Sequence, residues 1–273
     1  MPELPEVEIA RRQLARRVAG RRLDEVIVRD PQAIRGDWST RPRDALPDGP
    51  ARLAALVGAE AGEPMRHGKR LGWPFPPGGL LIHLGMSGAW VPGEEPPHAR
   101  VGLRFGDAVW WFRDPRRFGA LIPCPAARLA DRLAAGLGPD ALLAALPGPA
   151  LAARFRTRAA IKVALMDQGR LAGLGNIHAA EALFRARIHP AIPANALSDD
   201  QWEALSRAIV DQLRDAIDAQ QDGELVYLTE GGPNPFAVYG REGEPCPRCG
   251  TPIARIALGG RSTFYCPRCQ PAP

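Results

Sequence analysis

The chain of 273 residues carries two cysteine pairs near its end, Cys246-Pro247-Arg248-Cys249-Gly250 and Cys266-Pro267-Arg268-Cys269, with sixteen residues between the pairs. Each pair can place two thiolates on one side of a tight turn, and two such turns complete a closed, tetrahedral zinc site. Gly250 lacks a Cβ where the chain must turn sharply after the first pair. We therefore expect Cys246, Cys249, Cys266 and Cys269 to hold one structural Zn²⁺ in a C-terminal zinc ribbon.

Two disulfide bonds are the alternative use of these cysteines. The sequence begins Met1-Pro2-Glu3-Leu4-Pro5-Glu6, which is acidic and lacks the features of a signal peptide. Because disulfides belong to oxidising compartments, this start favours zinc. The fifth cysteine, Cys124, stands between two prolines, and we expect it to be a small buried apolar residue rather than a nucleophile.

Upstream of the cysteines, from about residue 125, leucine and alanine become frequent and apolar residues repeat at helical spacing. Ser198 followed by Gln201 is a capping-box pattern that predicts the start of a helix. One apolar face of that helix follows, made by Trp202, Leu205, Ile209 and Leu213. This part of the chain is expected to form a helical domain.

A glycine turn, Gly173-Leu174-Gly175-Asn176-Ile177, lies between two predicted helices at about 159–168 and 177–187. Asn176 is a good N-cap residue, so we expect it to cap the second helix. The free N–H groups of a helix N-terminus can hold a phosphate, which makes this turn a candidate DNA contact. An ordinary turn between two helices is the alternative.

The first half of the chain combines one helix with a β-rich region. Apolar residues at helical spacing predict a helix over 5–18, and short apolar runs punctuated by Gly and Pro predict strands from about 23 to 122. The turn Gly106-Asp107 between two alternating runs is typical of a tight hairpin. Many short strands with such turns indicate a β-sandwich or a barrel.

The charge of the chain points to an acidic partner. The net charge is +5 and the pI is about 9.2, a balance that favours nucleic acid. Only Lys69 and Lys162 are lysines among the 35 basic residues. Unlike arginine, lysine can lose its proton near neutral pH, so both become candidate site residues, with chance retention on the surface as the alternative. No run of 18 apolar residues occurs, which excludes a transmembrane helix.

Five segments in register resemble bacterial formamidopyrimidine-DNA glycosylase of the zinc-finger type, a bifunctional base-excision repair family. They are the opening Pro2–Glu8, His83–Gly88, Asp114–Gly119, the Gly-Leu-Gly-Asn turn and the zinc ribbon. The resemblance spans residues 2–270. It implies an α+β multidomain fold, with an N-terminal helix and β-sandwich at 1–124, a helix–two-turn–helix domain at 125–235 and a zinc finger at 236–273.

The resemblance also implies a chemistry. Pro2, freed when Met1 is removed, would attack the sugar C1′, expel the damaged base and form an iminium, with Glu3 as general acid. Lys69 would move protons during β-elimination, and Arg261 would clamp a phosphate in the δ-step, since arginine is an unlikely proton donor. Without these roles, Pro2 is simply a processed terminus and Glu3 stabilises the first helical turn, a task that Glu6 can also fill.

DNA contacts follow from the same resemblance. His98, Arg116, Lys162 and Asn176 match DNA-binding residues of the family. Met86, Arg116 and Phe118 match the wedge that fills the gap left by a flipped base. For Met86 and Phe118 the alternative is core packing. The implied partner is double-stranded DNA with a damaged base or abasic site, bound by a cytoplasmic, nucleoid-associated monomer that does not interact with membranes.

Two departures leave the preferred lesion open. His178 stands where the family usually has tyrosine, and 223–239 is shorter than the family segment that closes over 8-oxoguanine. A ring-opened formamidopyrimidine, an oxidised pyrimidine, as in the related endonuclease VIII group, or an unusual adduct are the alternatives. A non-catalytic DNA-binding protein is the alternative of a different class.

Overall fold

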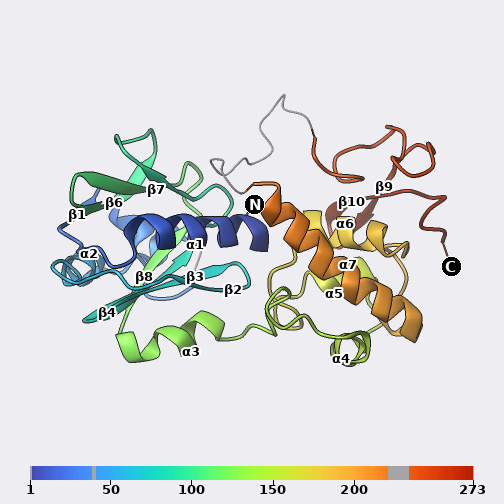
Figure 1. Ribbon diagram of the computed structural model, residues 1–273, viewed down its shortest axis with the longest axis horizontal. Coiled ribbons are helices and arrows are strands. Elements are labelled where there is room, and N and C mark those ends of the chain that lie inside the picture. The colour runs from blue at the N-terminus through green and yellow to red at the C-terminus, as the bar shows by residue number, and fades with distance from the viewer. Residues whose placement is uncertain (1, 39–40, 221–233, 273) are drawn as a thin grey trace. The chain divides into compact units, whose positions relative to one another are not determined.

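The computed structural model describes residues 2–38, 41–220 and 234–272 of the chain (Figure 1). Two compact units divide it, Met1–Ala135 and Gly136–Pro273. Within the described residues, no helix is long and apolar enough to cross a membrane. The α+β architecture expected from the sequence is confirmed, and each unit is described in turn.

The first unit is a helix followed by two antiparallel sheets. One sheet has the strand order β1-β6-β7-β5 and the other β2-β3-β4-β8. The elements are α1 (Leu4–Val18), β1 (Glu25–Val28), α2 (Gly49–Ala54), β2 (Met65–His67), β3 (Arg70–Phe75), β4 (Gly78–His83), β5 (Ala89–Pro92), β6 (Ala99–Phe105), β7 (Ala108–Arg113), β8 (Ala120–Cys124) and α3 (Leu129–Ala134).

Aromatic side chains join the two sheets into a sandwich. Trp73 on β3 stacks on Phe105 of β6, with ring centroids 5.7 Å apart, and meets Trp90 of β5 edge-on at 5.9 Å. Because these residues come from different sheets, the aromatic cluster forms the core between them. Of the two architectures that the sequence left open, the sandwich is the one formed.

Several local predictions for this unit are confirmed. The hairpin at Gly106-Asp107 joins β6 to β7, and Gly106 has a positive φ of 61°. Cys124 lies buried in β8, where burial raises the pKa of its thiol, so the thiol is a packed apolar group. α3 follows the sandwich and covers β3 and β4, because Gly72 and Gly79 leave room for Leu129 and Leu133.

The second unit is helical and ends in a hairpin. Its elements are α4 (Gly148–Arg154), α5 (Ile161–Leu165), α6 (Asn176–Arg185), α7 (Asp199–Asp218), β9 (Ala254–Leu258) and β10 (Arg261–Tyr265). α7 begins with the expected capping box, in which Gln201 N donates to Ser198 Oγ at 3.2 Å. Its predicted apolar face is buried, and Trp202 stacks on Phe155 at 5.7 Å.

A buried carboxylate connects α6 to the zinc-ribbon segment. Glu181 is 3% exposed and accepts three backbone hydrogen bonds of 2.9 Å, from Ala237, Val238 and Tyr239. Such a carboxylate fixes the path of the chain into the ribbon. The loop expected at 231–235 lies mostly outside the described residues, as does most of the shortened segment 223–239.

Candidate active site and nucleic-acid interface

The first candidate residues lie at the start of α1. Glu3 is the N-cap of this helix and only 3% exposed, and Pro2 before it is also buried. The N–H of Glu3 donates to Oε2 of Glu6 at 2.7 Å, within a capping box. Glu6 therefore stabilises the first turn, as expected. Met1 lies outside the described residues.

An ion-pair network ties α1 to the turn that carries Lys69. Glu8 on α1 accepts a hydrogen bond of 3.0 Å from Nε of Arg66 on β2, and Nη1 of Arg66 donates to the carbonyl of Gly68 at 3.1 Å. Gly68 has a positive φ of 56°, which opens the turn between β2 and β3, and Lys69 follows it half-buried. The helix of Pro2 and Glu3 is thereby anchored to the Lys69 turn.

The charge state of Glu8 reflects this network. Burial on its own would raise the pKa of the Glu8 carboxyl, but hydrogen bonds from Arg11 and Arg66 outweigh burial and lower the pKa to about 2. The side chains of Glu8 and Arg66 are 9% and 2% exposed. Glu8 is therefore ionised throughout the neutral range and holds Arg66 in place.

The three wedge candidates lie in two loops that one carboxylate joins. Asp114, 1% exposed, accepts hydrogen bonds of 2.7 Å from Ser87 Oγ and from the N–H of Gly119. Ser87 Oγ also accepts from the N–H of Arg116 at 3.2 Å. The loop of Met86 and the loop of Arg116 and Phe118 are thus one structure.

The exposure of these side chains bears on the alternative of core packing. Met86 and Phe118 are half-buried, whereas Arg116 is exposed with its guanidinium carbon 5.5 Å from the centroid of the Phe118 ring. Neither apolar side chain is part of the buried core. His98 is exposed with a positive φ of 67°, and its carbonyl accepts the N–H of Asp114 at 3.1 Å.

In the second unit, the structure brings together three candidates from distant parts of the sequence. Lys162 on α5 donates through Nζ to Oδ1 of Asn176, and Nδ2 of Asn176 donates to the carbonyl of Ser262 at 3.1 Å. Ser262 follows Arg261 on β10. Arg261 is exposed beside the turn Gly259-Gly260, whose residues have φ values of 56° and 71°.

The expected role of Asn176 as N-cap is wrong. Gly175 is the N-cap of α6, and Asn176 is the first helical residue. Its side chain makes no cap because Lys162 and Ser262 occupy its oxygen and its nitrogen. The first predicted helix is also shorter than expected, since α5 ends at Leu165 rather than near 168.

The four expected zinc ligands form one cluster. All four sulfur atoms lie within 4.8 Å of one another, with 4.0 Å between Cys246 and Cys269 and 3.5 Å between Cys249 and Cys266. A tetrahedral site with Zn–S bonds of about 2.3 Å has its sulfur atoms about 3.8 Å apart. The cluster therefore fits one structural Zn²⁺. Gly250 turns the chain with a φ of 74°, as predicted.

The departure at His178 has a structural context. This side chain is 1% exposed on α6, its Nδ1 lies 3.2 Å from Nε2 of Gln212, and its ring meets Phe236 edge-on at 6.2 Å. The ring is a packed part of the interior. Asp114 and Glu8 are functional candidates that sequence reasoning missed, although both lie inside the segments of the resemblance.

Comparison with known families matches three models to the chain in sequence order. Residues 1–121 match the formamidopyrimidine-DNA glycosylase N-terminal domain, residues 137–226 the formamidopyrimidine-DNA glycosylase H2TH domain, and residues 243–272 a zinc finger found in FPG and IleRS. These matches include the expected wedge, the glycine turn and all four cysteines.

Whole-chain comparisons agree with the family models. The formamidopyrimidine-DNA glycosylase of Aromatoleum aromaticum is 41% identical and aligns over 99% of both chains. A structure of MutM in complex with carbocyclic 8-oxo-G containing DNA has a TM-score of 0.85 at 29% identity, covering 99% of this chain and 100% of that one. A structure of Fpg from Lactococcus lactis, non-covalently bound to DNA containing an AP site, has a TM-score of 0.85 at 28% identity with the same coverage.

Proposed function

The chain belongs to the formamidopyrimidine-DNA glycosylase family, which makes it a DNA glycosylase and AP lyase of base excision repair, and from this we propose that Pro2 is its nucleophile. The observation that carries the proposal is the anchoring of α1 to the Lys69 turn through Glu8 and Arg66. This network fixes the position of α1, which begins beside Pro2 and Glu3, relative to Lys69. Catalysis by the Pro2 amine requires such fixed positions of the reacting groups.

The proposed reaction begins at the secondary amine of Pro2, which is free once Met1 is removed. The amine nitrogen attacks C1′ of the sugar, and the bond from C1′ to the damaged base breaks as the base leaves. The C1′–O4′ bond then opens to give the iminium, and Glu3 donates a proton to the sugar oxygen or to the base. The resulting iminium acidifies the C2′ proton, and Lys69 assists its removal in β-elimination. This β-elimination expels the phosphate on C3′, and δ-elimination then expels the phosphate on C5′, with Arg261 clamping phosphate oxygens.

In the second unit we assign phosphate binding to Lys162 and Asn176, beside the hairpin of Arg261. Met86, Arg116 and Phe118 are assigned to the wedge, and His98 to a backbone contact. Cys246, Cys249, Cys266 and Cys269 hold the Zn²⁺, which shapes the hairpin and takes no part in the reaction. The domains are 1–124, 125–235 and 236–273, and the enzyme acts as a monomer on DNA in the bacterial cytoplasm.

Borohydride trapping tests the nucleophile. Protein whose Met1 is removed is incubated with abasic-site, 8-oxoguanine, formamidopyrimidine and oxidised-pyrimidine duplexes, and each adduct is mapped by mass spectrometry. We expect the adduct on Pro2, and its loss when Gly-Ser precedes Pro2, because an amide nitrogen cannot attack. Trapping on another residue would refute the assignment. The ranking of the three damaged-base duplexes decides which lesion is preferred.

Glu3→Gln tests the acid. Glutamine keeps the size of the buried side chain but has no carboxyl proton to donate. We expect base removal to slow about 100-fold or more, the usual worth of general acid catalysis, while cleavage of a preformed abasic site is affected less. An equal loss on both substrates would show that Glu3 acts only on the structure of the helix.

A further inference from the structure

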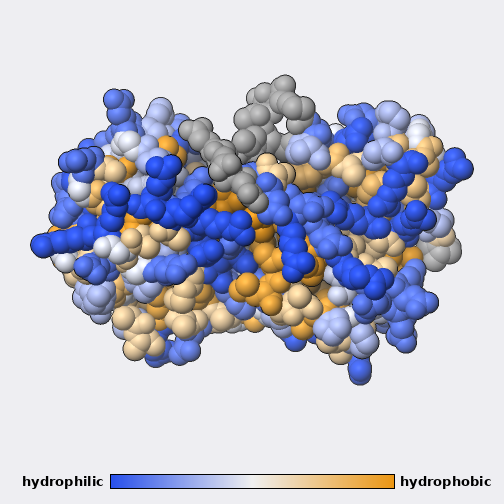
Figure 2. All heavy atoms as spheres, in the orientation of Figure 1, coloured by the Kyte–Doolittle hydropathy of each residue, from blue (hydrophilic) through white to orange (hydrophobic). Residues whose placement is uncertain are grey.

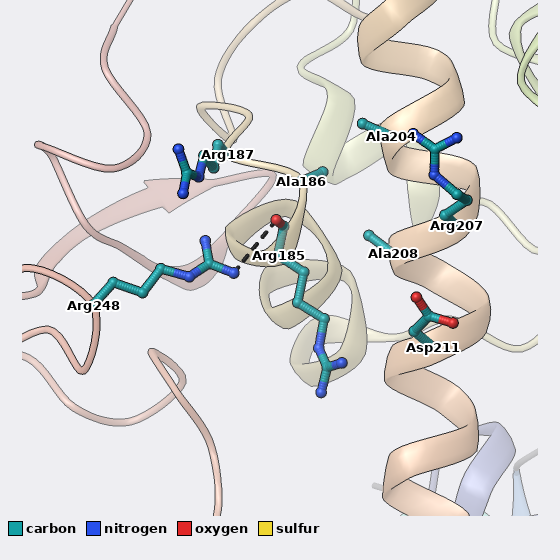
Figure 3. Close-up of a pocket in the computed structure, with 8 residues that line it drawn as sticks. All are labelled: Arg185, Ala186, Arg187, Ala204, Arg207, Ala208, Asp211 and Arg248. Carbon is teal, nitrogen blue, oxygen red and sulfur yellow. Dashed lines mark hydrogen bonds between the residues drawn. The ribbon is translucent and has the colours of Figure 1, made fainter.

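A pocket in the second unit lies outside the machinery described so far. It has a volume of about 470 Å³ and lies between the end of α6, the middle of α7 and Arg248 of the zinc-ribbon segment (Figure 3). Its lining residues are Arg185, Ala186, Arg187, Ala204, Arg207, Ala208, Asp211 and Arg248. Alanines thus form a small apolar surface that arginines surround.

The pocket is at the far end of α6 from the proposed phosphate site. Asn176 is the first residue of this helix and Arg185 the last, and ten residues at 1.5 Å each make a helix about 15 Å long. The hydrogen bonds of the Asn176 side chain instead run to Lys162 and Ser262. The pocket is therefore separate from the proposed phosphate site.

Carboxylates neutralise only part of the positive charge. Arg185 pairs with Asp215 at 2.7 Å, and Arg207 with Glu203 at 3.4 Å. Arg248 instead donates to the backbone carbonyl of Phe184 at 2.7 Å. It also donates to the carbonyl of Arg185 at 3.4 Å (Figure 3). Carbonyls orient a guanidinium without cancelling its charge, and among the described residues neither Arg187 nor Arg248 has a carboxylate partner.

Arg187 occupies a backbone position that favours glycine. The N–H of Ile188 donates to the carbonyl of Leu183 and that of Arg187 to Phe184, the two bonds of a Schellman motif. Arg187 is the residue of this motif in the left-handed region, with a φ of 58°. A side chain there is disfavoured, yet the chain carries an exposed arginine at the pocket.

We propose that this pocket binds an acidic peptide segment of a partner protein. Arginine forks bind carboxylates through paired hydrogen bonds, and the alanine surface suits a small apolar side chain between acidic residues. Figure 2 shows hydrophilic side chains gathered over α7. The sequence of α7 includes Glu203, Asp211 and Asp215, whose carboxylates would repel a continuous phosphate backbone but can alternate with the charges of a short peptide.

The probe is a fluorescein-labelled peptide of eight residues that alternates glutamate and leucine, with a glutamine–leucine peptide as its control. Fluorescence anisotropy of the intact protein should show saturable binding of the acidic peptide that weakens with salt. Arg187→Gly should reduce the affinity about 10-fold, the effect of losing one charge-assisted contact, and so should Arg207→Gln. Arg156→Gln, an exposed arginine outside the pocket, should have no effect.

A loss of peptide binding in Arg187→Gly should not come from unfolding, because glycine suits the backbone at residue 187. The Tm of Arg187→Gly should therefore equal or exceed that of the parent protein. Cleavage of damaged duplexes should also be unchanged, which separates this proposal from that of the nucleophile. Absence of saturable binding up to about 1 mM peptide would overturn the proposal. Loss of duplex or single-stranded DNA affinity in Arg187→Gly would overturn it too, and would assign the pocket to nucleic acid.

Discussion

Nζ of Lys162 donates a hydrogen bond to Oδ1 of Asn176, so a lysine of one helix and the first residue of the next form one polar unit. Lys162 is fully buried, while the other end of the Asn176 amide reaches the carbonyl of Ser262 on the zinc hairpin. The amide therefore connects the lysine to the residue beside Arg261. In the proposed phosphate site, these hydrogen bonds would hold groups from two helices and a hairpin next to one another.

Lys162→Met should weaken binding to all duplexes, damaged or intact, because it removes a charge without changing the volume much. Each phosphate charge neutralised by a protein contributes about 0.9 to the slope of log affinity against log salt, so the slope should fall by about 1. Affinity measured between low and moderate salt checks this. Lys162→Arg should keep the slope, and an unchanged slope in Lys162→Met would refute the phosphate contact.

Asp114→Asn should loosen the two loops that carry the proposed wedge residues. The carboxylate accepts from Ser87 and Gly119 at once, and hydrogen bonds to a charged group contribute about 1.5–3 kcal/mol. We expect the proposed wedge side chains to insert into DNA roughly 10-fold more slowly. The fluorescence of 2-aminopurine placed opposite the lesion measures this rate. Ser87→Ala removes one of these bonds and should have a smaller effect. Base flipping at the parent rate in both variants would show that the wedge needs no such support.

Removal of zinc should disturb the proposed phosphate site as well as the ribbon. The four thiolates hold the hairpin whose Ser262 carbonyl orients Asn176, and small ribbons rarely fold without their metal. Chelation should therefore lower both DNA affinity and the yield of borohydride adduct, and added Zn²⁺ should restore them. The helical signal in far-UV circular dichroism should change little, because the buried face of α7 packs on other helices. DNA binding that survives chelation would place the ribbon outside the interface.

The sequence predicts elements and clusters well where local chemistry dominates. The two cysteine pairs, the capping box of Ser198 and the hairpin at Gly106 each depend on residues close in sequence, and each forms as expected. For the β-rich region, the sequence left both a sandwich and a barrel open. The contacts that decide for the sandwich join different sheets, where Trp73 meets Phe105 and Trp90. Periodicity along one strand does not reveal its partner in another sheet.

The predicted N-cap at Asn176 failed for a related reason. Local propensity favours asparagine at that place, but Lys162 and Ser262, 14 and 86 residues away, take up its side chain. The roles of Asp114 and Glu8 were missed because their partners are also distant. Asp114 bonds Ser87, 27 residues away, and Glu8 bonds Arg66, 58 residues away. Tertiary hydrogen bonds of this kind leave no signal in a single sequence.

Glu8→Gln should lower the free energy of unfolding at neutral pH and should weaken the dependence of this free energy on acid pH. The folded pKa of about 2 lies below the ordinary value of 4.5, so ionised Glu8 stabilises the fold above pH 4.5, and this stabilisation is lost as the pH falls from 4.5 toward 2. Solvent screens part of this stabilisation, because Arg12, one of the partners of Glu8, is exposed. We therefore expect Glu8→Gln to lower the free energy of unfolding by about 2 kcal/mol at pH 7.

Urea unfolding at pH 7 and at pH 3 measures this contribution. The difference between parent and Glu8→Gln should be largest at pH 7 and should shrink at pH 3, where the unfolded carboxyl is protonated. Glu25→Gln is the matched control, because the exposed Glu25 pairs with Arg104 in the same unit without joining α1 to β2. If Glu8→Gln also lowers the yield of borohydride adduct under conditions where it is folded, the network positions Pro2. A stability difference that is equal at both pH values would contradict the ionised Glu8.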